Sequence, residues 1–186
     1  MKVLVPIADG VEEMEAVIII DTLRRAGWEV AVVGLSEGAV RASRGVRLLP
    51  DALLDEVDAS AYQMIVLPGG NGGTERLSTD ERILQVLRDF NNDPAKVVAA
   101  ICAGPLVLQA AGILRECLVT CHPGARPSLT SGRYIDSAVV VDGRLVTSQG
   151  PGTSFAFALK LIELVEGVEK ADALAEAMVV STTRSE

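Results

Sequence analysis

Cys102 is the residue whose surroundings most strongly indicate chemistry. It follows the apolar run Val97–Ile101, and the five residues centred on it read Ala-Ile-Cys-Ala-Gly. A small residue two positions before a nucleophile and a glycine two positions after it are typical of a nucleophile elbow, a tight strand-to-helix turn. At a helix N-terminus the dipole favours thiolate over thiol, and the N–H of Ala103 would meet a developing oxyanion. The alternative is a buried, inert cysteine.

Glu15 and His122 are the candidate proton-transfer groups. Helical spacing places Glu15 on a largely apolar face, where desolvation would raise its pKa and let the neutral acid donate to a thiolate or transfer protons. The helix N-terminus has the opposite effect on that pKa, and an acid on the surface is the alternative. His122 is the only histidine and ends the strand-like run Leu118–Thr120. It could serve Cys102 as a base, or be a loop histidine without a chemical role.

Two glycine-containing loops are weaker signals. Residues 68–73 read Pro-Gly-Gly-Asn-Gly-Gly, which is neither a Walker loop nor a GxGxxG motif. We expect this loop to form a second wall of the Cys102 cleft, with Gly69 and Gly70 near the substrate and the Gly70 N–H as an oxyanion donor. The segment from residue 150 to 154 would bring Pro151 to the same cleft. Each pattern alone is also typical of a plain turn.

Strand and helix patterns alternate along the chain, as in βαβ construction. The spacing of apolar residues predicts strands at Val3–Ile7, Val30–Gly34, Met64–Leu67, Val97–Ile101, Leu118–Thr120, Ala138–Val141 and Leu145–Ser148, a hairpin or extended segment at Ala42–Leu49, and helices at Val11–Ala26, Asp80–Asn91, Ala103–Ala111, Thr153–Val165 and Lys170–Met178. We therefore expect an α/β fold with a mostly parallel central sheet between helices, as a single domain over residues 1–186. Sites in such sheets lie at the carboxyl ends of the strands.

Composition excludes several classes of protein. The apolar fraction is 49% with only 3% aromatic residues, which suits an aliphatic core around a buried parallel sheet. A net charge of −8 without basic clusters disfavours a stable nucleic-acid complex, and no apolar run is long enough for a membrane span. Three cysteines and one histidine suit neither a disulfide framework nor a closed zinc site. We expect a cytoplasmic protein without a metal or organic cofactor.

Taken together, the motifs resemble the DJ/PfpI (ThiJ/PfpI) superfamily, in its branch of parkinsonism-associated protein deglycase and bacterial YajL-like proteins. The resemblance runs from about Lys2 to Val180. It rests on segments whose order and spacing match: Glu12 to Glu15, Arg24 to Gly27, Ser43-Arg44, Val66 to Asn71, Ala99 to Pro105, His122-Pro123 and Thr147 to Phe155. Cys117 and Cys121 lie outside this pattern, and Ala42 and Pro50 stand where human-type relatives carry further cysteines.

The resemblance implies a flavodoxin-like three-layer sandwich, a homodimer, and a Cys102 thiolate protected by a protonated Glu15. It implies a cofactor-independent deglycase or glutathione-independent glyoxalase. Such an enzyme would convert methylglyoxal, glyoxal and their early protein or nucleotide adducts to hydroxy acids, with a role in oxidative stress. The alternative is a redox sensor or holdase chaperone in which Cys102 is oxidised to sulfinate beside Arg44. A peptidase related to PfpI is disfavoured, since no triad acid accompanies the single histidine.

Overall fold

A mostly parallel sheet forms the centre of the computed structural model, which describes residues 1–181. Its strand order is β10-β11-β7-β6-β1-β2-β5, and only the β10–β11 pair is antiparallel. The strands are β1 (Lys2–Ile7), β2 (Glu29–Gly34), β5 (Ala52–Leu53), β6 (Met64–Leu67), β7 (Val97–Ile101), β10 (Val139–Asp142) and β11 (Leu145–Ser148). The chain order reverses between β1 and β6, which is the position where open α/β sheets bind ligands.

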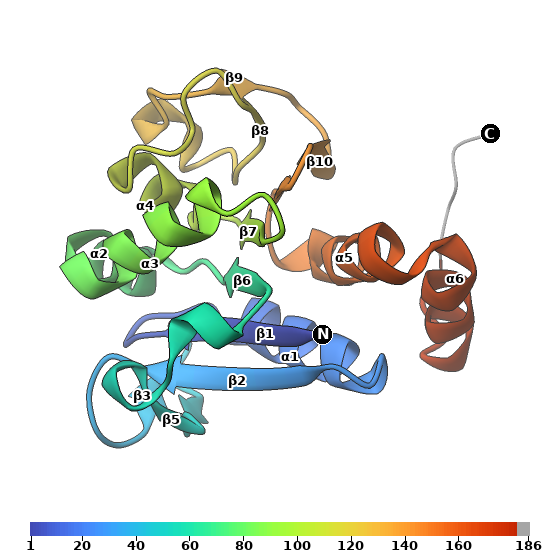
Figure 1. Cartoon of the computed structure of the whole chain (residues 1–186), viewed down its shortest axis with the longest axis horizontal. Coiled ribbons are helices and arrows are strands. Elements are labelled where there is room, and N and C mark those ends of the chain that lie inside the picture. The colour runs from blue at the N-terminus through green and yellow to red at the C-terminus, as the bar shows by residue number, and fades with distance from the viewer. Residues whose placement is uncertain (182–186) are drawn as a thin grey trace.

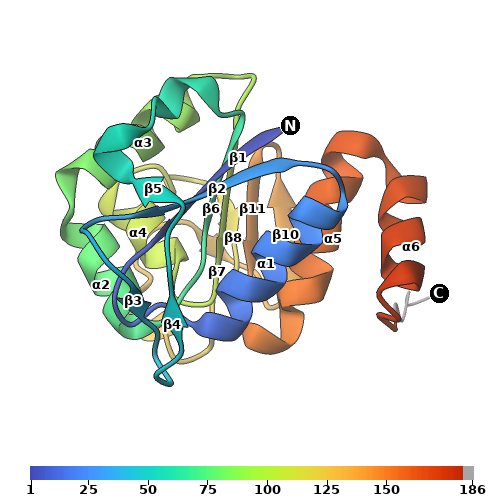
Figure 2. The same cartoon turned by 90° about the horizontal axis from the view of Figure 1, so that it is seen from below.

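Helices cover both faces of this sheet (Figures 1 and 2). Helices α1 (Glu13–Arg25) and α5 (Ser154–Glu166) pack on one face, and α2 (Asn71–Thr79), α3 (Glu81–Asn92) and α4 (Pro105–Ala110) pack on the other. Helix α6 (Val168–Ala177) lies against α5, away from the sheet. The predicted α/β class with a mostly parallel central sheet is confirmed. Within residues 1–181, no helix combines the length and apolarity needed to cross a bilayer.

Short elements complete the described chain. A hairpin of β3 (Val40–Arg41) and β4 (Arg47–Leu48) overlaps the expected segment Ala42–Leu49, but its first strand lies before that segment. The predicted strand Leu118–Thr120 appears as β8 (Leu118–Val119), which pairs with β9 (Arg133–Tyr134) and not with the main sheet. Single turns of 3-10 helix cover Leu54–Glu56, Ala59–Ala61, Arg126–Ser128 and Pro151–Thr153. Residues 182–186 of the expected single domain lie outside the described residues, and that domain assignment stays a prediction.

Helix α2 begins inside the glycine-rich segment that we expected to be only a loop. Its first turn packs directly against the backbone of the β1–α1 loop: a Cβ on Gly70 would lie 2.2 Å from the carbonyl oxygen of Gly10, and one on Gly73 would lie 2.9 Å from Cα of Val11. Gly70 also has a φ of +91°, a conformation that favours glycine. These glycines therefore allow two loops at the carboxyl edge of the sheet to touch.

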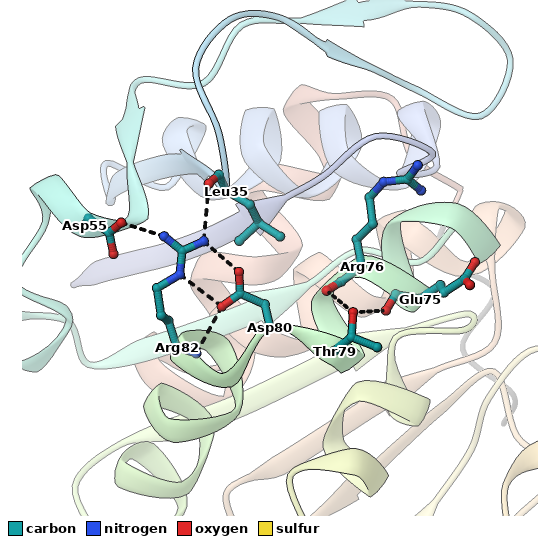
Figure 3. A network of polar contacts seen from close by, with 7 residues as sticks. All are labelled: Leu35, Asp55, Glu75, Arg76, Thr79, Asp80 and Arg82. Atoms are coloured by element: carbon teal, nitrogen blue, oxygen red, sulfur yellow. Dashed lines mark hydrogen bonds and ion pairs between the residues drawn. The ribbon is translucent and has the colours of Figure 1, made fainter.

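Arg82 ties the loop after β2 to the start of α3 at the same edge of the sheet (Figure 3). Its guanidinium contacts Asp55 at 2.5 Å and Asp80 at 2.6 Å, and it donates to the carbonyl oxygen of Leu35 at 3.3 Å. The hydrogen bond from Arg82 holds the pKa of Asp80, which also caps α3, below its usual value. A bidentate guanidinium that joins three segments in this way fixes their relative positions.

Candidate active site

Cys102 lies immediately after β7, at the carboxyl edge of the sheet. Its φ is +64°, an uncommon conformation for a residue other than glycine, and its side chain is half-buried. The Cys102 N–H donates to Ser148 O at 2.9 Å, and its carbonyl accepts from His122 N at 2.9 Å. These bonds hold the strained turn between the end of β11 and the segment after β8. The elbow predicted from the small flanking residues is therefore present.

The helix that follows this turn is shorter than expected. Residues 102–104 form a turn, and α4 runs only from Pro105 to Ala110, in contrast to the predicted Ala103–Ala111. Proline at the first helical position requires no N–H partner, which explains the start at Pro105. Because the sulfur lies outside a helix of only six residues, the predicted effect of a helix dipole on the thiol is small.

Glu15 is completely buried in α1, so the alternative of a surface acid is wrong. Its Oε2 accepts from Gly69 N at 2.7 Å, and Oε1 has no hydrogen-bond partner among the described residues. The Glu15 carboxyl also interacts with the Cys102 thiol: a Cβ built on Gly69 would meet both Cβ of Cys102, at 2.6 Å, and Oε2 of Glu15, at 2.8 Å. Desolvation by burial raises the pKa of Glu15 to about 7, despite opposing hydrogen bonds from Cys102 and Gly69.

The pKa of Cys102 is also raised, which corrects the expectation that its position alone would favour the thiolate. Burial is the largest cause and the charge of Glu15 is the next, and together they raise the pKa of Cys102 to about 12. Burial raises both pKa values, and the negative charge of Glu15 adds to the rise at Cys102. The two groups therefore titrate as a pair, which holds one proton between the two steps.

Backbone N–H groups converge on the Cys102 sulfur. Those of Gly70 and Ala103 hydrogen-bond to it and lower its pKa, although burial and Glu15 outweigh them. Both donors predicted for an oxyanion thus lie at the sulfur. Gly69, which we expected to contact substrate, instead donates its N–H to Glu15 and does not line the cleft. Its role is to connect the acid to the loop that carries Gly70.

A cleft of about 520 Å³ opens above Cys102. The predicted residues Gly70, Ala103, Arg44, His122 and Pro151 all line it. The structure therefore brings together at one cavity the residues that the sequence placed there, apart from Gly69 and the buried Glu15 beneath it. Other lining residues come from the β1–α1 loop, the β3–β4 loop, the start of α2 and the segment after His122: Gly10, Glu12, Ser43, Asn71, Gly72, Gly124 and Ala125.

His122 is exposed on the cleft wall. Its Nδ1 accepts from Gly124 N at 3.0 Å, so in the neutral ring the hydrogen is on Nε2. Within residues 1–181, no hydrogen bond joins the His122 side chain to the Cys102 sulfur. His122 is thus linked to Cys102 through the backbone, and the ring is available to a molecule in the cleft.

Glu12 and Glu13 are functional neighbours that the sequence reasoning treated only as helix-start acids. The Glu12 carboxylate caps α1 by accepting from Glu15 N at 2.8 Å. Glu13 is buried and accepts from the Ser43 hydroxyl and from Arg44 N, at 2.8 Å each, which holds the loop that carries Arg44. Desolvation alone would raise the pKa of Glu13, but hydrogen bonds from its own backbone N–H, from Ser43 and from Arg44 together outweigh it and lower the pKa. The spacing of three residues between Glu12 and Glu15, which is typical of helix-capping patterns, was the sequence signal that could have indicated the capping role of Glu12.

No group of three or more histidine, cysteine, aspartate or glutamate side chains is arranged to hold a metal ion in the part of the chain that the structure describes. The three cysteines, Cys102, Cys117 and Cys121, are unpaired. Cys121 is completely buried beside Ala103, and burial raises the pKa of its thiol.

Comparisons with known proteins identify the family. The model of the DJ-1/PfpI family matches residues 1–164. Protein DJ-1 homolog B of Arabidopsis thaliana is 45% identical over 96% of this chain, which spans only 41% of that protein. Protein dj-1beta of Drosophila melanogaster is 41% identical over 96% of each chain, and the glutathione-independent glyoxalase DJR-1.2 of Caenorhabditis elegans is 39% identical over 92% of this chain and 91% of that protein.

Solved structures agree with this assignment. The crystal structure of Drosophila melanogaster DJ-1beta has a TM-score of 0.92 and 42% identity, over 97% of this chain and 98% of that one. Oxidised DJ-1 of Toxoplasma gondii has a TM-score of 0.92 and 39% identity, over 97% and 99% of the two chains. The resemblance that the motifs carried is confirmed, and the chain belongs to the DJ-1/PfpI family, in its DJ-1 branch.

Proposed function

We propose that the chain is a cysteine-dependent, cofactor-independent glyoxalase or deglycase that acts on methylglyoxal, glyoxal and their early adducts. The observation that carries this proposal is the contact between Cys102 and a buried Glu15 at the floor of a cleft. Between its two titration steps the pair keeps one proton. If that proton lies on Glu15, the sulfur carries the charge and meets two N–H donors and an acid, whereas a Glu15 carboxylate meets one N–H and a thiol.

The first step forms a carbon–sulfur bond. The Cys102 thiolate adds to the aldehyde carbon of the dicarbonyl, and the electron pair of the C=O bond moves to oxygen. Because the sulfur loses its negative charge on addition, the N–H groups of Gly70 and Ala103 become free to donate to this new oxyanion. This charge moves within a desolvated site, where fixed donors stabilise it most effectively.

The second step moves a proton between adjacent carbons. Glu15 first gives its proton to the oxyanion, and its carboxylate, assisted by His122 on the cleft wall, then removes the proton from the former aldehyde carbon and returns one to the neighbouring carbonyl carbon. The hydroxyl proton of the first carbon passes to the oxygen of the second. The first carbon is oxidised to a thioester and the second is reduced to an alcohol, so no external oxidant or reductant is consumed. Water then cleaves the thioester, which releases a hydroxy acid such as lactate and restores Cys102.

The name of the Caenorhabditis elegans relative supports the glyoxalase part of this proposal. The substrates that we propose are small 2-oxoaldehydes or glycated protein and nucleotide adducts. The proposed location is the cytoplasm, in keeping with three unpaired cysteines.

The test is lactate formation from methylglyoxal by purified wild type, Cys102→Ser and Glu15→Gln, in a buffer without amines. We expect lactate from the wild type, none above background from Cys102→Ser, and a loss of at least about 100-fold in Glu15→Gln, because general acid–base groups typically contribute 10²–10⁴-fold. Equal rates in all three proteins would refute the enzyme proposal.

A redox sensor or holdase chaperone is the second candidate. The oxidised state named for the Toxoplasma gondii relative favours it, as does a half-buried sulfur beside an acid and two N–H donors. Each molecule of peroxide would transfer one oxygen to the sulfur and leave as water, first to sulfenate and then to sulfinate. The alternative predicts that peroxide changes the binding of unfolded clients by the wild type but not by Cys102→Ser, and unchanged binding would count against it.

A further inference from the structure

Glu12 is a charged residue of the cleft that the proposed mechanism does not use. It is half-buried and lines the cavity together with Cys102. Its Oε2 accepts from Glu15 N at 2.8 Å, and its own N–H donates to Gly69 O at 3.0 Å. The position of Glu12 is therefore fixed by the two residues that also hold the acid beside the sulfur.

The charge of Glu12 is not neutralised by an ion pair within residues 1–181. This charge acts on Glu15, where it adds to desolvation in raising the pKa. Arg44 is the basic residue on the cleft wall, yet no comparable effect of its charge reaches Glu15 or Cys102. Of the two opposite charges in the cleft, the negative one acts on Glu15, the acid beside the reacting sulfur.

We propose that Glu12 is a specificity-determining residue whose carboxylate disfavours anionic electrophiles at Cys102. Neutral 2-oxoaldehydes would then react in preference to 2-oxo acids, which present a similar carbonyl group but carry a negative charge. The same repulsion acts on the hydroxy acid product and favours its release. The choice of substrate class rests on the proposed function, whereas the effect of charge on electrophiles at Cys102 does not.

The experiment compares two alkylating reagents of similar size, neutral iodoacetamide and anionic iodoacetate. Both react with the same thiolate, so the ratio of their second-order rate constants cancels any change in the fraction of Cys102 that is ionised. The rate constants are measured by intact mass at low ionic strength, with Cys102→Ser as the blank for Cys117 and Cys121. The variants are Glu12→Gln, which keeps an oxygen that can cap α1, and Arg44→Gln.

We expect the iodoacetate/iodoacetamide ratio to rise about three- to ten-fold in Glu12→Gln and to fall in Arg44→Gln. The matched control is Glu169→Gln, which removes the same charge from exposed α6 and should leave the ratio unchanged. In the wild type, added salt should raise the ratio by screening the carboxylate, a measurement that needs no folded variant.

A ratio in Glu12→Gln equal to that of the wild type would overturn the proposal, as would an equal rise in Glu169→Gln or a wild-type ratio that salt does not raise. Failure of lactate formation would leave this result intact and refute only the proposed function. The two inferences are therefore separable.

Discussion

The chemistry of the site depends on one proton shared between two side chains. Burial alone would leave a cysteine neutral and unreactive, and burial alone would keep a glutamate protonated. Placed in contact, Cys102 and Glu15 cannot both be charged, and the backbone N–H groups of Gly70 and Ala103 stabilise charge on sulfur and not on oxygen. The reactivity that we propose is a property of this pair, which neither residue would have alone.

Glu15 should make the stability of the fold depend on pH. Its folded-state pKa is raised from 4.5 to about 7, so the native state binds more protons than the unfolded state in that window. The contribution of Glu15 to stability is then fully present below about pH 4.5 and is lost as pH rises through about 7, a loss of about 2 to 3 kcal/mol. Glu15→Gln, which cannot ionise, should lack this fall. Urea unfolding at several pH values, followed by the fluorescence of the single, buried Trp28, measures it.

The exposed variant Glu169→Gln is the control and should follow the wild-type pH dependence. If Glu15→Gln and the wild type lost stability in parallel between pH 4.5 and about pH 7, the assignment of a raised pKa to Glu15 would be wrong.

At the scale of elements, glycines determine how closely the loops around the site approach. The β6–α2 connection brings Gly70 to the sulfur only because its backbone touches the β1–α1 loop, from which Glu12 and α1 follow. Helix α1 then supplies Glu15, which contacts the Cys102 thiol. The site is thus made by the contact of two loops that the sequence separates widely.

Gly70→Ala should be strongly destabilising for this reason. The new Cβ would lie 2.2 Å from Gly10 O and 2.5 Å from Glu12 N, which are backbone atoms that cannot rotate away. Gly38 has the same φ of +91° with nothing within 4 Å of a built Cβ, so Gly38→Ala is a matched control for backbone strain alone. We expect a loss of about 1 kcal/mol for Gly38→Ala and at least about 3 kcal/mol for Gly70→Ala in urea unfolding. Equal losses would show that the close approach is relieved elsewhere.

Local patterns predicted most of the strands and helices and most of the site residues. The elbow at Cys102 and the buried face that carries Glu15 follow from spacing within a few residues, which a sequence displays directly. Helix α2 was missed because glycines disfavour helices, and its packing partner at Gly10 is distant in the chain. The raised pKa of Cys102 was missed because depth of burial and the proximity of Glu15 are tertiary properties.

At the scale of the whole molecule, exposed apolar side chains indicate where a second copy would bind. Met14 and Val17 lie on α1 with 55% and 48% of their surface exposed, and Val46 and Leu49 are exposed on the loop around β4. Glu13 joins that loop to α1 through Ser43 and Arg44, and Figure 2 shows β4 beside the start of the helix. We keep the homodimer as a proposal and assign this surface to it, since contiguous exposed apolar surface on a soluble protein often marks an interface with another chain.

A dimer should have twice the chain mass of 19.6 kDa in light scattering. Val17→Glu should give a monomer, because it buries a charge in the interface. Val141→Glu changes an equally apolar residue on β10, 40% exposed, and should remain dimeric. A wild-type mass of one chain would contradict the dimer, and a Val17→Glu protein of twice the chain mass would exclude this surface.

The pH dependence of Cys102 alkylation tests the shared proton most directly. Iodoacetamide reacts with thiolate alone, and peptide mapping reports Cys102 separately from Cys117 and Cys121. If the pair loses its first proton from sulfur, as we propose, the rate should rise with a midpoint below the pKa of about 8.5 of a free cysteine and then level off, with the midpoint moved upward in Glu15→Gln. A rate that keeps rising to about pH 10 without a plateau, alike in both proteins, would mean that the proton stays on the thiol and would contradict the account.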